Sequence, residues 1–238
     1  ILEANGTVNF GSNKAYRAML KKIKAGSPAT NPDDLQYILD NVDVDNLFEY
    51  MALEMFVGNS DIGNIRYYRL HQEGSKWKWI WYDADYGLYS SKFNSPWSYL
   101  KVKGMGEQKI DNTIFLKLLE HPDYKRKFLE KLADVYKTFT TEYMTQVLDG
   151  VLAEIQPEMK NHWERWGELN DKAVTSEVPT TIDGAYTYWE SRVNRLYNTL
   201  KVRPHRLWDF IKDEFKLTKT EMEELFGPQP DYPDDAVL

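Results

Sequence analysis

The chain has 238 residues, a formal net charge of -7 and no cysteine. Its length suits one domain or at most two, its apolar content suffices for a core, and the lack of cysteine excludes disulfides and thiolate metal sites. Because the acidic residues are spread along the chain and no apolar run approaches a membrane span, neither nucleic acid nor membrane insertion is expected.

Helical signals fill the first part of the chain. An amphipathic helix is predicted from about Asn13 to Lys24. Asn31 followed by Pro32 marks the start of a second helix, because Asn caps the first turn and Pro fits its first position. Asp43 opens a third and stronger helix, which Gly58 ends. The apolar residues of this third helix recur at helical spacing: Leu47, Phe48, Met51, Ala52, Met55 and Phe56.

A β-hairpin is predicted at about residues 65–82. Aromatic and β-branched residues dominate both of its arms, and the polar turn between them contains Gly74. Trp77, Trp79 and Trp81 alternate along the second arm and therefore share one face. We expect this face to pack against helices; the alternative is a platform on which sugar rings stack.

Two clusters of polar residues flank this hairpin and are the most informative feature of the chain. Asp61 and Asn64 precede its first arm, and Asp83 and Asp85 follow its second. Folding of the hairpin brings its two ends together, so these four residues should meet at one end of a rigid sheet. Three carboxylates in one place repel one another unless a cation offsets their charge, and Mg²⁺ prefers such oxygen ligands. If strand geometry continues to Asp85, both of the later aspartates point to the same side.

This set of residues suits phosphoryl transfer. Asn64, Asp83 and Asp85 could hold metal ions across the phosphates, while Asp61 could accept the proton of an attacking hydroxyl. The plainer alternative is that Asp61 and Asn64 cap a turn and that the acids at the strand end stay solvated. The occurrence of both clusters at opposite ends of one hairpin favours the functional interpretation.

The remainder of the chain is predicted to be helical after a long ordered loop at 86–108. Pro204 is predicted to begin a short helix of its own, and a capping box at Thr218 starts the last one. Other helices are expected at about 112–119, 121–136, 143–155, around 163–166 and at 182–200. The sequence therefore predicts one lobe, 1–227, that is mainly α with one small antiparallel hairpin, followed by a loose acidic tail at 228–238.

The motifs around the hairpin resemble those of the CotH kinase family, named for spore coat protein H. They are Asn59-x-Asp61-x-x-Asn64, Tyr67-Tyr68-Arg69, Lys76-Trp77 and Tyr82-Asp83-x-Asp85-x-Gly87. The helix that opens at Asp43 and the C-terminal run with Arg192, Arg195 and Arg203-Pro204 also fit the family. The resemblance covers most of the chain, from about Asp43 to Phe215, and the hairpin motif is its more specific part.

The resemblance implies the C-terminal lobe of an atypical protein kinase-like fold, which phosphorylates Ser/Thr of protein substrates with ATP and a divalent cation. Asp61 would then be the catalytic aspartate, and Asn64, Asp83 and Asp85 would bind Mg²⁺, Mn²⁺ or Ca²⁺. The resemblance also implies a bacterial protein of the spore coat, the extracellular space or the cell surface. The alternative function is a non-catalytic coat or surface protein that uses the same fold for assembly or glycan contact.

One departure from the family pattern concerns the nucleotide-binding N-terminal lobe. The sequence has no Gly-rich loop and no strand-borne lysine for ATP phosphates; Lys21, Lys22 and Lys24 lie on a predicted helix and are expected to be solvated. The chain begins at Ile1 rather than at Met, so we expect that lobe to precede it. A lone C-terminal lobe would hold part of the metal site but bind ATP poorly, so weak or absent kinase activity is expected.

Overall fold

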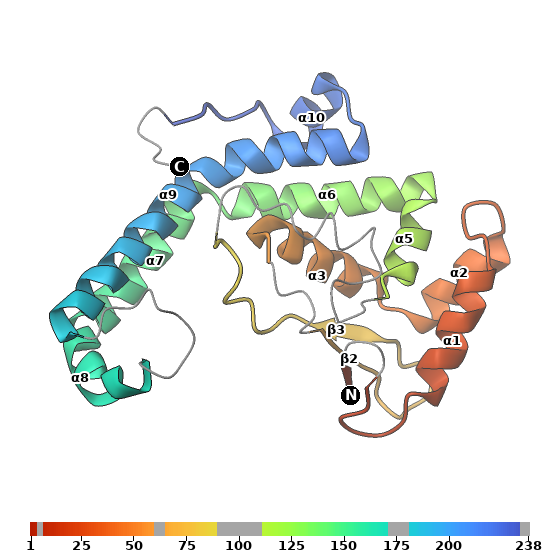
Figure 1. Ribbon diagram of the computed structural model, residues 1–238. Coiled ribbons are helices and arrows are strands. Elements are labelled where there is room, and N and C mark those ends of the chain that lie inside the picture. Colours follow the sequence, from red (N-terminus) through yellow and green to blue (C-terminus); the bar gives the residue numbers. More distant parts are fainter. Residues whose placement is uncertain (4–6, 60–64, 90–110, 171–180, 234–238) are drawn as a thin grey trace.

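The computed structural model shows a mainly helical molecule with one small antiparallel sheet (Figure 1). It describes residues 1–3, 7–59, 65–89, 111–170 and 181–233. Within these ranges, no helix combines the length and the apolarity that crossing a bilayer requires. The predicted fold class, mainly α with a small antiparallel element, is thus confirmed.

The sheet contains the predicted hairpin and one strand more. Its strands are β1 (Leu2–Glu3), β2 (Arg66–Tyr68) and β3 (Lys78–Ile80), in the order β1-β2-β3. Tyr67 lies opposite Trp79 in the hairpin and opposite Leu2 across the other edge of β2. The prediction of a hairpin alone was therefore incomplete. A strand of two residues is too short to show the alternation from which strands are predicted.

The tryptophans of the second arm differ in burial. Trp77 is 4% exposed, and its ring lies 5.0 Å from that of Tyr16 in an edge-on contact. Trp79 is half-buried near Tyr67, whereas Trp81 is 42% exposed. Packing against the rest of the molecule therefore accounts for Trp77 and Trp79, as expected for a sheet face that covers a core.

The free edge of β3 is bound to the start of helix α3 (Val44–Val57). The side chain of Asp43 caps this helix by accepting a hydrogen bond from the backbone N–H of Asn46. The Asn46 amide in turn accepts a hydrogen bond of 2.6 Å from the backbone N–H of Trp79 and donates one of 3.2 Å to its carbonyl oxygen. These bonds satisfy an edge that would otherwise expose unpaired groups, and they fix α3 relative to the sheet.

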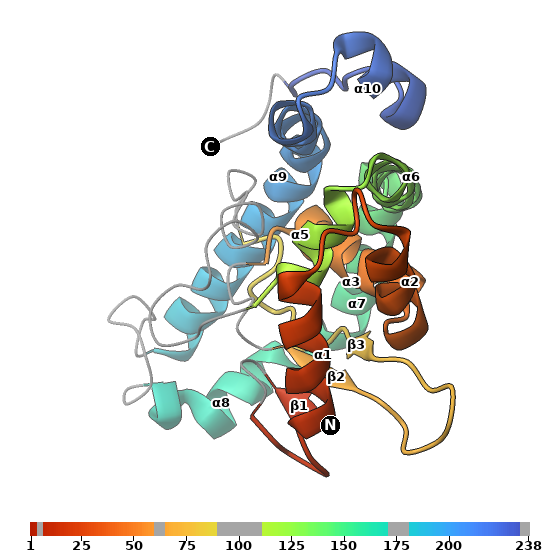
Figure 2. The same cartoon turned by 90° about the vertical axis from the view of Figure 1, so that its right-hand side faces the viewer.

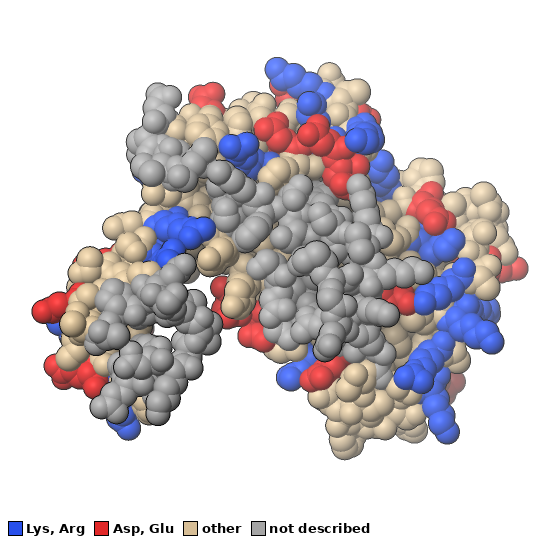
Figure 3. Space-filling model, in the orientation of Figure 1, with Lys and Arg blue, Asp and Glu red and all other residues tan. Residues whose placement is uncertain are grey.

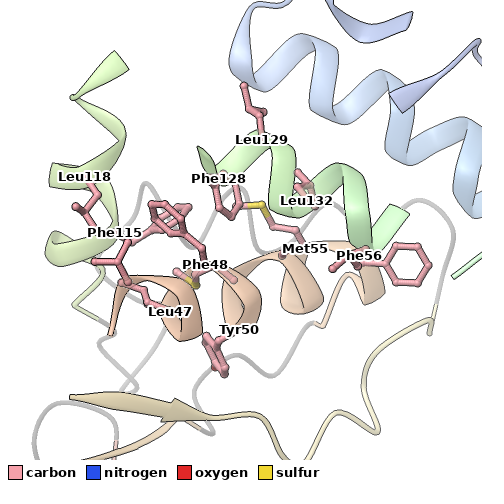
Figure 4. Packing of buried hydrophobic residues seen from close by; sticks show 14 of the residues in the cluster. Leu47, Phe48, Tyr50, Met55, Phe56, Phe115, Leu118, Phe128, Leu129 and Leu132 are labelled. Atoms are coloured by element: carbon pink, nitrogen blue, oxygen red, sulfur yellow. The ribbon is translucent and has the colours of Figure 1, made fainter. Parts of the chain in front are cut away.

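Helix α3 lies at the centre of the core (Figure 4). It packs against α5 (Thr113–Leu119) and α6 (Pro122–Thr138), where Phe48, Phe115 and Phe128 form edge-to-face contacts with centroids 4.8–6.0 Å apart. A helix that is apolar nearly all round must be buried, which explains its central place. Helices α1 (Lys14–Ala25), α2 (Pro32–Asn41) and α10 (Lys219–Phe226) complete this part of the molecule.

The remaining helices form an arm that projects away from the central helices (Figures 1 and 2). It consists of α7 (Thr141–Ile155), the short 3-10 helix η2 (Gln156–Glu158), α8 (Met159–Asn170) and the first half of α9 (Ile182–Phe215). The second half of α9 runs beside α6 and α10 (Figure 1). Helix α9 therefore connects the arm to the core.

Helix α9 runs through Pro204, so the prediction that a new helix begins there was wrong. Proline lacks the N–H that would bond the carbonyl oxygen of Leu200. The hydroxyl of Thr141 replaces that donor, at 3.0 Å from the Leu200 oxygen. The hydroxyl of Tyr136 also donates to the carbonyl oxygen of Pro204, at 3.2 Å. Neighbouring side chains thus stabilise a helix that its own sequence interrupts.

The described part of the C-terminal tail, 228–233, lies along α9. The indole of Trp208 donates to the Gly227 carbonyl oxygen at 3.1 Å, and a ring nitrogen of His205 lies 2.7 Å from the carbonyl oxygen of Pro230. The ring of Tyr232 also stacks edge-on against His205. These contacts hold a stretch that its composition assigns to a loose tail; residues 234–238 lie outside the described residues.

Candidate functional site

The structure describes two of the four predicted site residues. Asp83 and Asp85 lie in the segment that leaves β3, and both are exposed. Asp61 and Asn64 lie outside the described residues, but their flanking neighbours Asn59 and Ile65 are described and buried. These neighbours and the segment that carries Asp83 therefore define the described part of the site.

Asp83 and Asp85 do not continue the strand. Strand β3 ends at Ile80, and the backbone of Asp83 adopts the left-handed conformation, with φ of 55°. Aspartate is among the few residues other than glycine that occupy this region readily. The chain thus turns at Asp83, and the alternation that was expected to place both carboxylates on one side does not apply. Asp85 instead lines a hollow beside α9.

A tight turn follows, and it packs on the end of α3. The N–H of Gly87 bonds the carbonyl oxygen of Ala84 at 2.8 Å, and the N–H of Leu88 bonds that of Val57 at 2.6 Å. A Cβ atom on Gly87 would lie 2.8 Å from the Ala84 oxygen and 3.0 Å from the Val57 side chain. A bulkier residue at position 87 would therefore be resisted by this close approach rather than by the backbone angle.

Leu88 is held in a strained conformation. Its φ is 56°, which bulky residues rarely adopt. Such a backbone costs on the order of 1–3 kcal/mol and persists only where the surroundings determine it, often at functional sites. Here the bond from Leu88 to Val57 supplies that restraint.

A buried carboxyl group lies behind these segments. Glu54 of α3 is only 4% exposed, and its carboxyl group takes side-chain hydrogen bonds from Tyr50, Asn59 and Trp81. Burial raises its pKa to about 7, and the three hydrogen bonds oppose that rise. Its Oε2 atom is buried and has no hydrogen-bond partner among the described residues. A neutral carboxylic acid is therefore substantially populated near neutral pH.

Glu54 joins the two stretches of chain that lead to Asp61 and to Asp83. Asn59 stands two residues before Asp61, and Trp81 stands two residues before Asp83. One side chain thus binds both segments at once. Glu54 was not among the residues predicted for the site from the sequence. The signal that could have found it is a single acidic residue in the otherwise apolar second half of a buried helix.

The pairing of the two hairpin strands also brings these two stretches of chain together. Arg66, the first residue of β2, lies opposite Ile80, the last residue of β3. The guanidinium of Arg66 also lies 4.6 Å from the centre of the Tyr82 ring. Both flanks of the 60–64 segment are thus linked to the chain just before Asp83: Arg66 contacts Tyr82 directly, and Asn59 is connected to Trp81 through Glu54.

The end of α3 is anchored by a buried arginine from α9. Arg203 is 1% exposed and donates to the carbonyl oxygens of Met55 at 2.8 Å and Phe56 at 2.9 Å. These carbonyls lie in the last turn of α3, where they lack helical partners and where a cation is favoured. Burial lowers the pKa of Arg203 to about 9, so the group stays charged at neutral pH. Gly58, in left-handed conformation, then ends the helix.

Any metal site in this region would depend on the predicted oxygen ligands. Within the described ranges, no group of three or more His, Asp or Glu side chains could hold a metal ion. Asp83 and Asp85 supply carboxylates, the ligand type that hard divalent cations prefer. A complete shell would need oxygens from Asn64 or Asp61 as well.

These observations define a mainly helical domain with one small sheet. The segment that follows the last strand carries two acidic residues, and a buried carboxyl group lies beside it near the end of a helix. The chain matches the family model described as CotH kinase protein over residues 3–207. It belongs to the CotH kinase family. The matched region also takes in α1 and α2, which precede the motifs that suggested the family. No curated protein and no solved structure matches the chain.

Proposed function

We propose that this chain carries the acceptor and metal-binding part of a CotH-type protein kinase site. Such a site transfers a phosphoryl group from ATP to a Ser or Thr hydroxyl of a protein. Family membership supports the class of protein. The observation that carries the site is the pair of hydrogen bonds from Asn59 and Trp81 to Glu54, because it ties together the segments that bear Asp61 and Asp83.

The residues have different roles in this proposal, according to their chemistry. Asp83, Asp85 and Asn64 bind a divalent cation, Mg²⁺, Mn²⁺ or Ca²⁺, which would neutralise charge on the phosphates. Asp61 orients the attacking hydroxyl and accepts its proton. Glu54 touches neither reactant in this proposal; it positions the two segments. The sequence shows no Gly-rich loop for ATP, so we expect the isolated chain to bind ATP weakly and to phosphorylate little.

The partner is a protein, and the family points to where it acts. Spore coat proteins gave the family its name, so we place this protein in the coat or at the surface of a bacterium. A coat or surface protein would then be its substrate.

The proposal is tested by metal-dependent stability. Mg²⁺, Mn²⁺ or Ca²⁺ should raise the melting temperature of the wild type. The rise should disappear in Asp83→Asn and Asp85→Asn and persist in Asp134→Asn, an exposed acid of α6 that serves as control. Asp61→Asn should retain most of the rise but abolish any phosphorylation of a protein substrate. No rise with any cation, or a rise that all four variants retain, would instead favour a non-catalytic coat or surface role.

A further inference from the structure

A hollow of about 460 Å³ lies between the segment that leaves β3 and helix α9. Residues 85–89 form one side of it, and residues of α9 form the other. Three tyrosines and three charged residues contribute most of its polar groups: Tyr86, Tyr89, Tyr188, Asp85, Arg192 and Arg195. Figure 3 shows basic side chains gathered near the place where the arm meets the central helices.

The two arginines of the hollow are held in place by aromatic rings. Arg192 lies with its guanidinium 4.4 Å from the centre of the Tyr188 ring and donates to the Tyr188 hydroxyl at 2.5 Å. Arg195 lies 4.7 Å from the centre of the Tyr89 ring. The arginines are three residues apart on one helix and therefore share a face. A guanidinium stacked on a ring keeps its N–H groups at its edge, in a restrained orientation.

The charge of the lining favours an anion. Two arginines oppose one carboxylate, that of Asp85, and the tyrosines add hydroxyl donors. Among the described residues, Arg195 forms no ion pair with a carboxylate, and its guanidinium lies over the Tyr89 ring. Paired guanidinium groups match the spaced oxygens of a phosphate, to which each can donate two parallel hydrogen bonds.

We propose that this hollow binds a phosphate group on a protein segment, with Arg192 and Arg195 as its ligands. A protein source fits because the tyrosine rings beside the arginines offer apolar contact to the residues that flank a phosphorylated side chain. Binding itself requires neither ATP nor a metal. Its consequence rests on the proposed function: because Asp85 lines the same hollow, the site would select substrates that already carry a phosphate near the acceptor hydroxyl.

Calorimetric titration of the chain in EDTA tests this proposal. The probes are a short synthetic phosphoserine peptide, the same peptide without phosphate, inorganic phosphate and ADP. We expect saturable binding of the phosphopeptide, weaker binding of inorganic phosphate and none of the unmodified peptide. Arg192→Gln and Arg195→Gln should each weaken phosphopeptide binding about tenfold or more. Lys201→Gln, an exposed residue of the same helix outside the hollow, should leave it unchanged.

Asp85→Asn should change the affinity for the phosphopeptide in the opposite direction. It removes the negative charge from the lining, so phosphopeptide binding in EDTA should become tighter. Tighter binding of ADP than of phosphopeptide would overturn the assignment to a protein source. The site would be overturned altogether if the phosphopeptide showed no saturable binding, or if a variant with both Arg192→Gln and Arg195→Gln bound it as tightly as the wild type. If the phosphopeptide binds while cations leave the melting temperature unchanged, the proposed phosphoryl transfer is contradicted and the proposed phosphate site in the hollow is supported.

Discussion

Arg203 of α9 donates a hydrogen bond of 2.9 Å to the backbone oxygen of Phe56, which lies 147 residues earlier in the chain. It donates to the Met55 oxygen as well, so one buried guanidinium satisfies two carbonyls in the last turn of α3. The chain leaves this turn through Asn59 toward Asp61. The arm-bearing helix thus fixes the point from which the predicted catalytic segment departs.

Replacing Arg203 by methionine should therefore destabilise the whole domain. Two buried carbonyl oxygens would lose their donors, and each such loss costs on the order of 1–3 kcal/mol. We expect the free energy of unfolding, measured by urea titration, to fall by about 2–4 kcal/mol. Lys201→Met makes the same change of charge on the same helix at an exposed position. It should lower the free energy of unfolding by less than about 0.5 kcal/mol. Equal losses in both variants would contradict a specific role for Arg203.

Glu54 should make stability depend on pH. Because burial raises its pKa from 4.5 to about 7, the folded protein holds a proton that the unfolded chain has released. Its contribution to stability is thus fully present below about pH 4.5 and is lost as the pH rises through 7. The pKa difference corresponds to a loss of roughly 3 kcal/mol.

Glu54→Gln removes this titrating group and keeps a similar shape. Urea titrations at pH 5 and pH 8 should show that the variant loses less stability over this interval than the wild type does. Glu49→Gln changes an exposed residue of the same helix and should behave like the wild type. If Glu54→Gln and the wild type lost the same amount, Glu54 would have to be ionised throughout.

Gly87→Ala tests the tight turn after Asp85. The added methyl group would lie 2.8 Å from the Ala84 oxygen and 3.0 Å from Val57, so the turn must shift away from α3. Overpacking of this kind costs about 1–3 kcal/mol, and the shift should also weaken any cation bound by Asp85. Gly150→Ala is the matched control, because a Cβ there meets nothing within 4 Å. It lies inside α7 and should stabilise the protein by up to about 1 kcal/mol, as seen by thermal unfolding.

The continuity of α9 through Pro204 predicts a coupled pair of substitutions. Thr141→Val removes the hydroxyl that bonds the Leu200 oxygen, which should cost about 1–2 kcal/mol. Pro204→Ala restores a backbone N–H able to bond the same oxygen. In that background Thr141→Val should therefore cost clearly less. A double-mutant cycle measures this difference, and additive effects would show that the hydroxyl does not replace the missing donor.

Much of the helical framework followed from local sequence signals. Asn31, Asp43 and Thr218 cap helices where the sequence predicted them to, and Pro157 lies in the break between α7 and α8. The hairpin was also predicted, because alternating aromatic residues around a polar turn specify it locally. The first strand, the unbroken α9 and the turn at Asp83 were not, since each depends on a partner or a backbone angle that no short window contains.

The candidate site divides in the same way. Its acidic residues were predicted from residue types and spacing alone, because the chemistry of a side chain depends only on the residue type; the structure describes Asp83 and Asp85. Tertiary structure decided which groups surround them: the burial of Glu54, its bonds to Asn59 and Trp81, and the hollow that Asp85 shares with Arg195. Desolvation and hydrogen bonding between residues distant in the chain produce these features, and they arise only when the helices have packed.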